Sequence, residues 1–236
     1  MALRALFASP SRNILKALDP GFPEGINGPD LMQLFRKQSE RFGTQMVQED
    51  VSEVDFGNHP YSIRSDNREV KAHSIIISTG AQARWLNLKS EQELRGFGVS
   101  ACATCDGFFF KDKTVAVVGG GNAAVEEAMF LTKFASKVKL IHRRDALRAE
   151  KMLQSKLMAN KKIEIIWDSI VEEVIGNKEP KSVTGLKIKN VKTNKIEELK
   201  IDGLFIAIGH DPATQLFKDK LDMDKEGYLI TKPDST

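Results

Sequence analysis

The sequence of 236 residues is short of cysteine and of long apolar runs. Its only cysteines are Cys102 and Cys105, whereas a secreted chain of this size that relied on disulfides would carry more. No hydrophobic stretch approaches the roughly 18–20 residues of a membrane span, and runs such as Ile75–Ile77 are short. The four histidines are scattered singly, which argues against a zinc site, since zinc needs about four ligands. These shortages exclude a disulfide-stapled secreted domain and a membrane protein, and no metal site is expected.

Charge of one sign is not in excess either. Thirty-five Lys and Arg against 32 Asp and Glu give a net charge of +3. The isoelectric point of about 8.7 lies below the roughly 9 typical of a nucleic-acid-binding domain. With 41% hydrophobic and 28% charged residues, the composition is typical of a soluble globular chain. We therefore expect one large or two small domains, with neither a nucleic-acid partner nor a membrane partner.

Residues 1–18 differ from the rest of the chain. Arg4, Arg12 and Lys16 stand among Ala, Leu and Phe, and no acidic residue precedes Asp19. This composition is typical of an organelle transit peptide, although a short amphipathic helix or an artefact of where the chain was cut is the preferred interpretation. We expect a cytoplasmic protein, with the organelle matrix as the alternative if residues 1–18 are a transit peptide.

The first half of the chain predicts a helix followed by a β-meander. Pro29 is suited to a first helical position and Gly43 to a stop. The expected helix carries Leu31, Leu34, Phe35 and Phe42 on one face. Short runs separated by turn residues then predict strands: Met46–Val47, Val51–Phe56, Tyr61–Ile63 and Val70–Ala72. The β-branched run from Ser74 to Gly80 predicts a buried strand that feeds a tight turn.

From Lys113 onward, strands and helices alternate before a second meander. Helices are expected at Asn122–Phe134 and Leu147–Asn160. Strands are expected at Thr114–Val118, Val138–Ile141, Ile163–Trp167, Val171–Ile175, Val183–Lys189, Ile196–Ile201 and Leu204–Ile208. This order predicts a nucleotide-binding α/β domain with an inserted β-layer.

A glycine-rich turn lies between the first strand and helix of this second unit. It matches the dinucleotide fingerprint G-x-G-x-x-A in Gly119, Gly120, Gly121, Asn122, Ala123 and Ala124. The pattern alone is weak, but here it follows a strand and opens a helix, which is the required context. A pyrophosphate would lie at the helix N-terminus, where N–H groups and the dipole favour anions. A β–α turn with no ligand is the alternative.

A basic cluster ends the second strand. An NAD enzyme places Asp or Glu about 20 residues after the glycines, to hold the ribose 2′-hydroxyl. This chain instead has His142, Arg143, Arg144 and Arg148, and guanidinium groups bind a 2′-phosphate through charge-assisted bonds. The cluster favours NADPH over a solvated basic helix start with Asp145 as its cap.

The two cysteines form a C-x-x-C motif, Cys102 to Cys105, which indicates redox chemistry near a βαβ pattern. Asp106 could supply the proton that such chemistry needs. Two buried cysteines, or Asp106 as a helix cap, are the alternatives. Because NADPH delivers hydride and a disulfide is a poor hydride acceptor, a carrier is needed between them, and the chemistry predicts FAD.

These motifs together resemble the low-molecular-weight, flavin-dependent thioredoxin reductases. The resemblance is carried by CATCDGFFF, the stretch VAVVGGGNAAVEEAMFLTKFASKV, HRRDALRAEK, GFPEGINGPDL, IIISTGA and GLFIAIGHDP. It covers residues 21 to 236 and implies an α/β, three-layer, Rossmann-like fold. It also implies one complete NADPH domain and an FAD domain incomplete at both ends. The expected ranges are an atypical segment over 1–20, the partial FAD domain with the cysteine pair at its junction over 21–112, and the NADPH domain with the start of a return linker over 113–236.

The resemblance also implies roles for individual residues. Cys105 would lie next to the flavin, Cys102 would attack the thioredoxin disulfide and Asp106 would supply protons. The NADPH site would include Asn122, Ala123, Ala124, Glu126, Arg143, Arg144 and Arg148, and Thr79 and Gly80 would lie near FAD. Phe108 and Phe109 match positions that dock thioredoxin, with core packing as the alternative.

The resemblance further implies a homodimer. Because the first unit has no strand and glycine turn of its own, we expect weak or no FAD binding and impaired activity. The alternatives are a related flavin-dependent reductase with a peroxidase or ferredoxin partner, and a non-catalytic NADPH-binding redox sensor.

Overall fold

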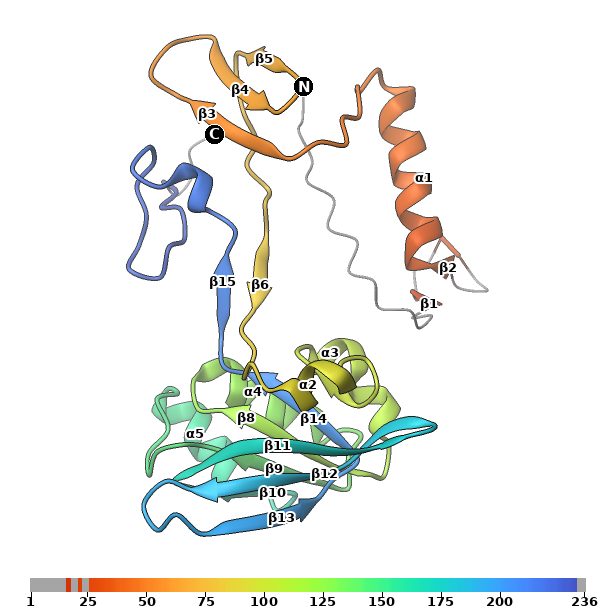
Figure 1. Cartoon of the computed structure of the whole chain (residues 1–236), viewed down its shortest axis with the longest axis vertical. Coiled ribbons are helices and arrows are strands. Elements are labelled where there is room, and N and C mark those ends of the chain that lie inside the picture. Colours follow the sequence, from red (N-terminus) through yellow and green to blue (C-terminus); the bar gives the residue numbers. More distant parts are fainter. Residues whose placement is uncertain (1–15, 18–20, 23–25, 233–236) are drawn as a thin grey trace. The chain divides into compact units, whose positions relative to one another are not determined.

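The computed structural model describes residues 16–17, 21–22 and 26–232, which form two compact units (Figure 1). Unit 1 combines the described residues up to Gln82 with those from Asp211 onward, and unit 2 is Ala83–His210. The chain crosses between them at β6 (Ala81–Ala83) and β15 (His210–Pro212), which pair with each other. The segment with transit-peptide composition lies, apart from Lys16 and Ala17, outside the described residues.

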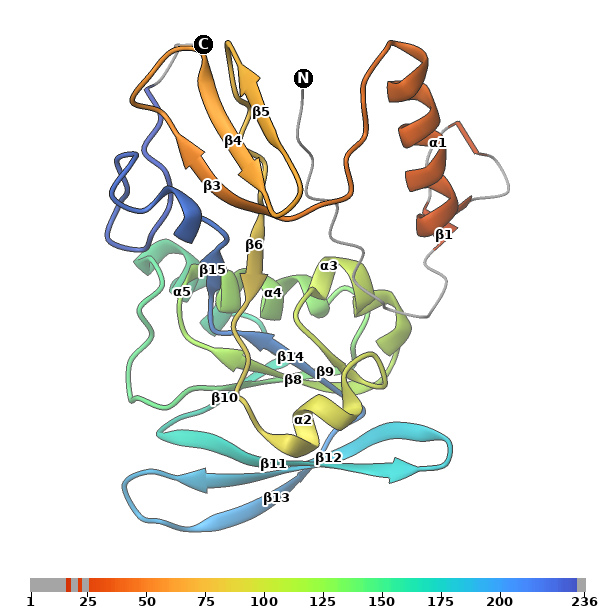
Figure 2. The same cartoon turned by 45° about the horizontal axis from the view of Figure 1, so that its top comes forward.

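Unit 2 is built on a parallel sheet of five strands (Figure 2). The strand order is β10 (Ile163–Ile166), β9 (Lys137–Ile141), β8 (Thr114–Gly119), β14 (Gly203–Ala207) and β7 (Val99–Ser100). Val115 to Val118 of β8 are all buried, which is why the strand reads as a continuous apolar run. The predicted strands at 114–118, 138–141, 163–167 and 204–208 are confirmed, and β7 was missed.

Both faces of this sheet are covered, which gives three layers. The helices α4 (Asn122–Leu131) and α5 (Lys151–Met158) cover one face. The antiparallel sheet of β11 (Ser169–Lys178), β12 (Lys181–Asn190) and β13 (Ile196–Lys200) covers the other. Val115 and Val117 point to the helices and Ala116 and Val118 to the antiparallel sheet, as the two-residue period of a strand requires. The predicted α/β class and inserted β-layer are confirmed.

Unit 2 begins earlier than the predicted boundary at residue 113. It includes the short elements α2 (Lys89–Leu94), β7, α3 (Ala103–Asp106) and η1 (Gly107–Phe110). The reason is packing, because β7 pairs with β14 and α3 packs against α4. The cysteine pair therefore lies inside unit 2. The expected helix at 147–160 is also shorter, since Leu147 and Ala149 enter the core before α5 begins.

Unit 1 contains α1 (Gly28–Arg41) and the meander of β3 (Val51–Asp55), β4 (Tyr61–Ser65) and β5 (Glu69–Ala72), as predicted. The predicted strand at Met46–Val47 is wrong, since those residues form no strand. The short strands β1 (Lys16–Ala17) and β2 (Ile26–Asn27) also pair. Its core joins Val54, Ile63 and Ala72 to Phe217 of η2 (Gln215–Phe217). The Lys220 ammonium donates to the Val54 carbonyl at 2.6 Å. The residues after Asp211 thus complete the meander.

The predicted strand from Ser74 to Gly80 is wrong. The segment is assigned no strand, and within the described residues it has no ladder partner. Ile75 and Ile77 pack at the edge of the unit 1 core, whereas Ile76 is 73% exposed. An apolar run predicts burial on both faces only where a neighbouring strand and covering layers are present.

Leu140 of β9 tests the core of unit 2, because it is fully buried against the helices. Leu140→Ala should lower the free energy of unfolding by about 2–5 kcal/mol. Urea unfolding followed by tryptophan fluorescence measures this, since Trp85 and Trp167 both lie in unit 2. Met158→Ala is the matched control, because Met158 is 56% exposed, and it should change the value by less than about 0.5 kcal/mol. Equal losses would contradict the assigned core.

Candidate functional site

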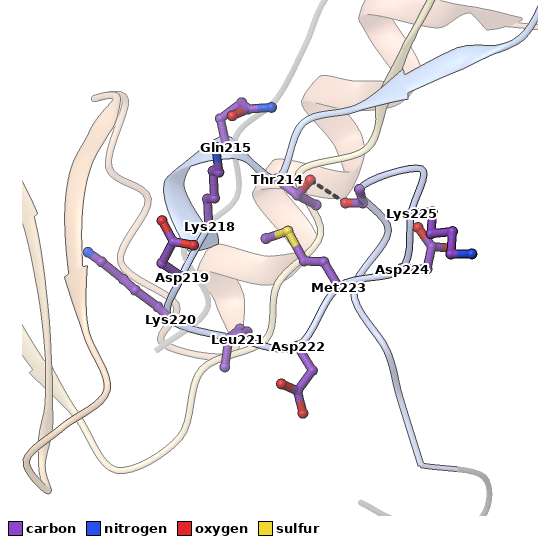
Figure 3. A pocket seen from close by; sticks show the side chains of 11 residues that line it. Thr214, Gln215, Lys218, Asp219, Lys220, Leu221, Asp222, Met223, Asp224 and Lys225 are labelled. Atoms are coloured by element: carbon purple, nitrogen blue, oxygen red, sulfur yellow. Dashed lines mark hydrogen bonds between the residues drawn. The ribbon is translucent and has the colours of Figure 1, made fainter.

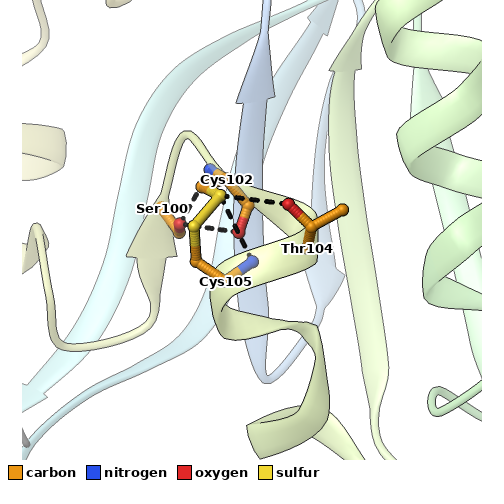
Figure 4. Close-up of a disulfide and its surroundings, with 4 residues drawn as sticks. All are labelled: Ser100, Cys102, Thr104 and Cys105. Carbon is orange, nitrogen blue, oxygen red and sulfur yellow. Dashed lines mark hydrogen bonds between the residues drawn. A yellow bond between two sulfur atoms is a disulfide. The ribbon is translucent and has the colours of Figure 1, made fainter. Parts of the chain in front are cut away.

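The cysteine pair caps a short helix at the edge of unit 2. Cys102 and Cys105 form a disulfide with Cα atoms 5.3 Å apart (Figure 4). Cys102 is the N-cap residue of α3, and its Sγ accepts the Cys105 N–H at 3.2 Å. The Cys102 N–H donates to Ser100 Oγ at 3.0 Å. Thr104 Oγ1 lies 3.4 Å from Cys102 Sγ, so the Cys102 sulfur is held by its own loop.

The pair is accessible, although the residues around it anchor the loop. Cys105 is exposed and Cys102 partly so, while Ala103 between them is buried. The alternative of two buried cysteines is therefore wrong. Asp106 follows directly, and its N–H donates to the Cys102 carbonyl at 3.1 Å. Asp106 is the N-cap residue of η1, as the helix-cap alternative has it, but its carboxylate makes no capping hydrogen bond there.

The glycine turn is shaped by the neighbours of its backbone. A Cβ on Gly119 would lie 2.3 Å from the Ala207 carbonyl oxygen and 2.5 Å from the Ala124 Cβ. Gly119 and the small Ala124 therefore let α4 pack closely on β8 and β14, as the fingerprint requires. A Cβ on Gly121, the N-cap of α4, would meet no described atom within 4 Å, and this cap makes no side-chain hydrogen bond. The open space at the helix N-terminus fits a pyrophosphate.

His142 lies beside this turn rather than in the open space. Its ring is 5% exposed and would be 2.1 Å from a Cβ on Gly120. Its Nε2 bonds the Ala146 carbonyl at 3.0 Å. Burial lowers the pKa of the imidazole, opposed by backbone hydrogen bonds to Ala146 and Gly119. His142 thus supports the backbone of the turn, and a neutral ring suits that place.

The three arginines of the basic cluster are exposed. Arg143, Arg144 and Arg148 have no ion-pair partner among the described residues. The nearby carboxylate is paired elsewhere, because Asp145 accepts from Lys192 Nζ at 2.9 Å, which lowers the pKa of Asp145. Because Glu150 is the N-cap of α5, the alternative of a helix capped by Asp145 is wrong. Three unpaired guanidinium groups fit a phosphate.

The remaining predicted residues are distributed over both units. Asn122 joins α4 to α5, since its Oδ1 accepts the Glu150 N–H at 2.8 Å. Ala123 and Glu126 are exposed on α4. Gly80 adopts a φ of +73°, and its carbonyl accepts the Ala213 N–H at 2.9 Å. Thr79 and Gly80 belong to unit 1, whereas the other predicted site residues belong to unit 2.

Sequence reasoning missed Glu127. This residue lies on α4 at helical spacing from the buried Ala124 and Leu131, a position that could have signalled its partial burial. Burial raises the pKa of its carboxyl group to about 7, opposed by the Ala103 N–H of the cysteine motif.

A hollow in unit 1 holds none of the predicted residues. It has a volume of about 730 Å³ and is lined mostly by polar side chains between Thr214 and Gly227, together with Leu221 and Met223 (Figure 3). Thr214 Oγ1 closes one side by donating to the Gly227 carbonyl at 2.6 Å. Within the described residues no cluster of metal-ligating side chains occurs. Among them, no helix has the length and apolar character that crossing a membrane requires.

The fold and these groups define the class: an α/β protein of the FAD/NAD(P)-binding, Rossmann-like type that carries a surface cysteine pair. The family model of the pyridine nucleotide-disulphide oxidoreductases matches residues 8–235, and the chain belongs to that family.

Similar proteins agree with this assignment. The chain is 53% identical to a thioredoxin reductase of Rickettsia felis over 92% of this chain and 70% of that protein. Among solved structures it is similar to thioredoxin reductases from Giardia duodenalis (TM-score 0.81, 42% identity, 91% of this chain and 71% of that one) and Streptococcus pyogenes (TM-score 0.78, 39% identity, 92% and 70%). The resemblance expected from the sequence motifs is confirmed.

Two neighbouring glycines allow a matched test of the turn. Gly120→Ala should lower the free energy of unfolding by about 1–3 kcal/mol through overpacking, because the new methyl group meets the His142 ring. Gly121→Ala should change it by less than about 0.5 kcal/mol, because its Cβ enters open space. Urea unfolding of both variants measures the difference. A larger loss of stability for Gly121→Ala than for Gly120→Ala would contradict the close contact between Gly120 and His142.

Proposed function

We propose that this chain passes electrons from NADPH through FAD and the Cys102–Cys105 pair to the disulfide of thioredoxin. The observation that carries the proposal is the accessible cysteine pair, packed through α3 on the same helix whose N-terminus forms the glycine turn. Membership of the pyridine nucleotide-disulphide oxidoreductases supports the reaction class. The names of the relatives support thioredoxin as the partner.

The residues of unit 2 fit NADPH. The first N–H groups of α4, from Gly121 to Ala124, would hold the pyrophosphate, and the open space at Gly121 admits it. Arg143, Arg144 and Arg148 would hold the 2′-phosphate with their unpaired guanidinium groups. His142 and Asn122 would keep the turn and the start of α5 in place, and Glu126 would line the exposed side of the site.

The cysteine pair would accept two electrons. FAD, when bound, supplies the conversion of a hydride donor into a reductant for a disulfide. The S–S bond then breaks to give two sulfurs that bind two protons, and Asp106 is placed beside the pair to deliver one of them. Cys102 would attack the disulfide of thioredoxin as a thiolate. We place Thr79 and Gly80 in the FAD site.

Two aromatic side chains extend the proposed docking surface. Phe108 is 67% and Phe109 54% exposed, with ring centroids 6.3 Å apart. This exposure rules out simple core packing and supports contact with thioredoxin, because exposed aromatic side chains are enriched at protein interfaces. The homodimer implied by the resemblance stays a prediction, which sedimentation of the purified chain would test.

The basic cluster should give a preference for NADPH over NADH. Replacing Arg143, Arg144 and Arg148 by Gln should weaken NADPH binding at least about tenfold, since hydrogen bonds to charged groups contribute about 1.5–3 kcal/mol each. The affinity for NADH should not change. Isothermal titration measures both, with the exposed Lys200→Gln of β13 as a control for charge. Equal affinities of the unchanged chain for the two nucleotides would overturn the assignment.

The cysteine pair should be indispensable for turnover. Cys102→Ser should reduce NADPH-dependent reduction of thioredoxin by at least about a thousandfold, as expected when a nucleophile is removed, and should leave NADPH binding intact. The assay follows NADPH oxidation with thioredoxin and added FAD. Full activity in the variant would refute the role of the pair. Turnover with a peroxidase or ferredoxin instead of thioredoxin would refute the partner.

A further inference from the structure

Glu127 is a half-buried ionisable residue that the proposed electron path does not use. It shares a face of α4 with the buried Ala124 and Leu131, three residues before it and four residues after it. Its Oε2 is enclosed, with no hydrogen-bond partner in the described part of the chain. A buried polar atom without a partner is rare in native proteins and calls for an explanation.

The group that faces this carboxyl is the backbone of the cysteine motif. The N–H of Ala103 interacts with the Glu127 carboxyl group, and Ala103 is only 1% exposed. Ala103 follows the N-cap Cys102 as the first residue of α3, so its N–H has no acceptor within the helix. Because Ala103 directly follows Cys102, the Glu127 carboxyl group interacts with the residue next to the disulfide.

No other charged group shifts the pKa of the Glu127 carboxyl group. Burial has the larger effect and raises the pKa to about 7, whereas the interaction with the Ala103 N–H acts to lower the pKa. β8 and β14 have no ionisable side chain. The ionisable groups on the other elements packed against α4 are Cys102 at the cap of α3, Cys105 and Asp106 on α3, Lys151 and Lys156 on α5, and Lys137 and Lys139 on β9. None of these side chains contributes to the shift.

We propose that Glu127 is a positioning residue for the cysteine pair: it holds the start of α3 through Ala103, and its charge controls thiolate formation at Cys102. The inference deepens the proposed function, because thiolate is the form that reacts with a disulfide. A carboxylate beside the motif disfavours a second negative charge. Above about pH 7, where Glu127 is ionised, the Cys102 thiol therefore loses its proton less readily than it would beside a neutral group.

The reduced pair can be prepared without nucleotide or flavin. Dithiothreitol gives two electrons and two protons to the Cys102–Cys105 bond, which breaks to two thiols, while the reagent closes to its cyclic disulfide. Ionisation of Cys102 then releases one proton to water. The rate at which iodoacetamide alkylates Cys102 reports the thiolate fraction.

The test compares pH profiles of alkylation for the reduced full chain and for Glu127→Gln, from about pH 5 to about pH 9, with peptide mass spectrometry to separate the two cysteines. Gln keeps an acceptor for the Ala103 N–H and removes the charge. We expect the midpoint for Cys102 to fall by at least about half a pH unit, which is about a threefold gain in thiolate below the midpoint. Glu173→Gln, an exposed glutamate on β11, should match the unchanged chain. Superimposed profiles for Glu127→Gln and the unchanged chain would overturn the proposal.

A second measurement needs no substitution. Carbon-13 NMR of the Glu127 carboxyl should show a higher pKa when the pair is reduced and ionised than when it is oxidised. The same pKa in both states would also overturn the proposal, even if Glu127→Gln does not fold. Because neither experiment involves NADPH, FAD or thioredoxin, a failed electron path and a failed role for Glu127 give different results.

Discussion

The close packing of α4 on strands β8 and β14 is the constraint on which both parts of the site depend. Gly119 and Ala124 leave no room for larger groups beside Ala207, and this contact fixes where α4 begins and which way it points. The N-terminus of α4 opens the glycine turn, and the second turn of α4 faces the cysteine motif through Glu127 and Ala103. One helix therefore connects the proposed nucleotide site with the cysteine pair.

The charge at the basic cluster and the charge beside the cysteine pair have different physical origins. At the basic cluster, Lys192 pairs with Asp145 and leaves the arginines without a competing carboxylate, so their charge is available to an anion from solvent. Beside the cysteine pair, burial raises the pKa of Glu127 to about 7, so its carboxyl group is near the midpoint of its titration at neutral pH. The first arrangement favours a permanently charged ligand. The second makes chemistry at the pair sensitive to pH in the neutral range.

The sequence predicted the motifs and missed the contacts between distant segments. Val115 to Val118 and Gly119 to Ala124 were predictable, because a buried strand, a glycine turn and a helix form from adjacent residues. The conformation of the run from Ser74 to Gly80 was not predictable, because burial of an apolar run requires a neighbouring strand, and within the described residues none pairs with it. The start of unit 2 was not predictable either, because β7 is only two residues long and is recognised as a strand only through its pairing with β14. Glu127 was overlooked because its interaction with Ala103 joins two segments that are separate in the sequence.

The proposed function requires that electrons from NADPH reach the Cys102–Cys105 disulfide within this chain. The most direct measurement is a titration of the oxidised full chain with NADPH in the presence of FAD and the absence of thioredoxin, with mass spectrometric counting of alkylated thiols. Two new thiols, at Cys102 and Cys105, are expected for each NADPH oxidised. NADPH oxidation that leaves the disulfide intact would contradict the proposed function.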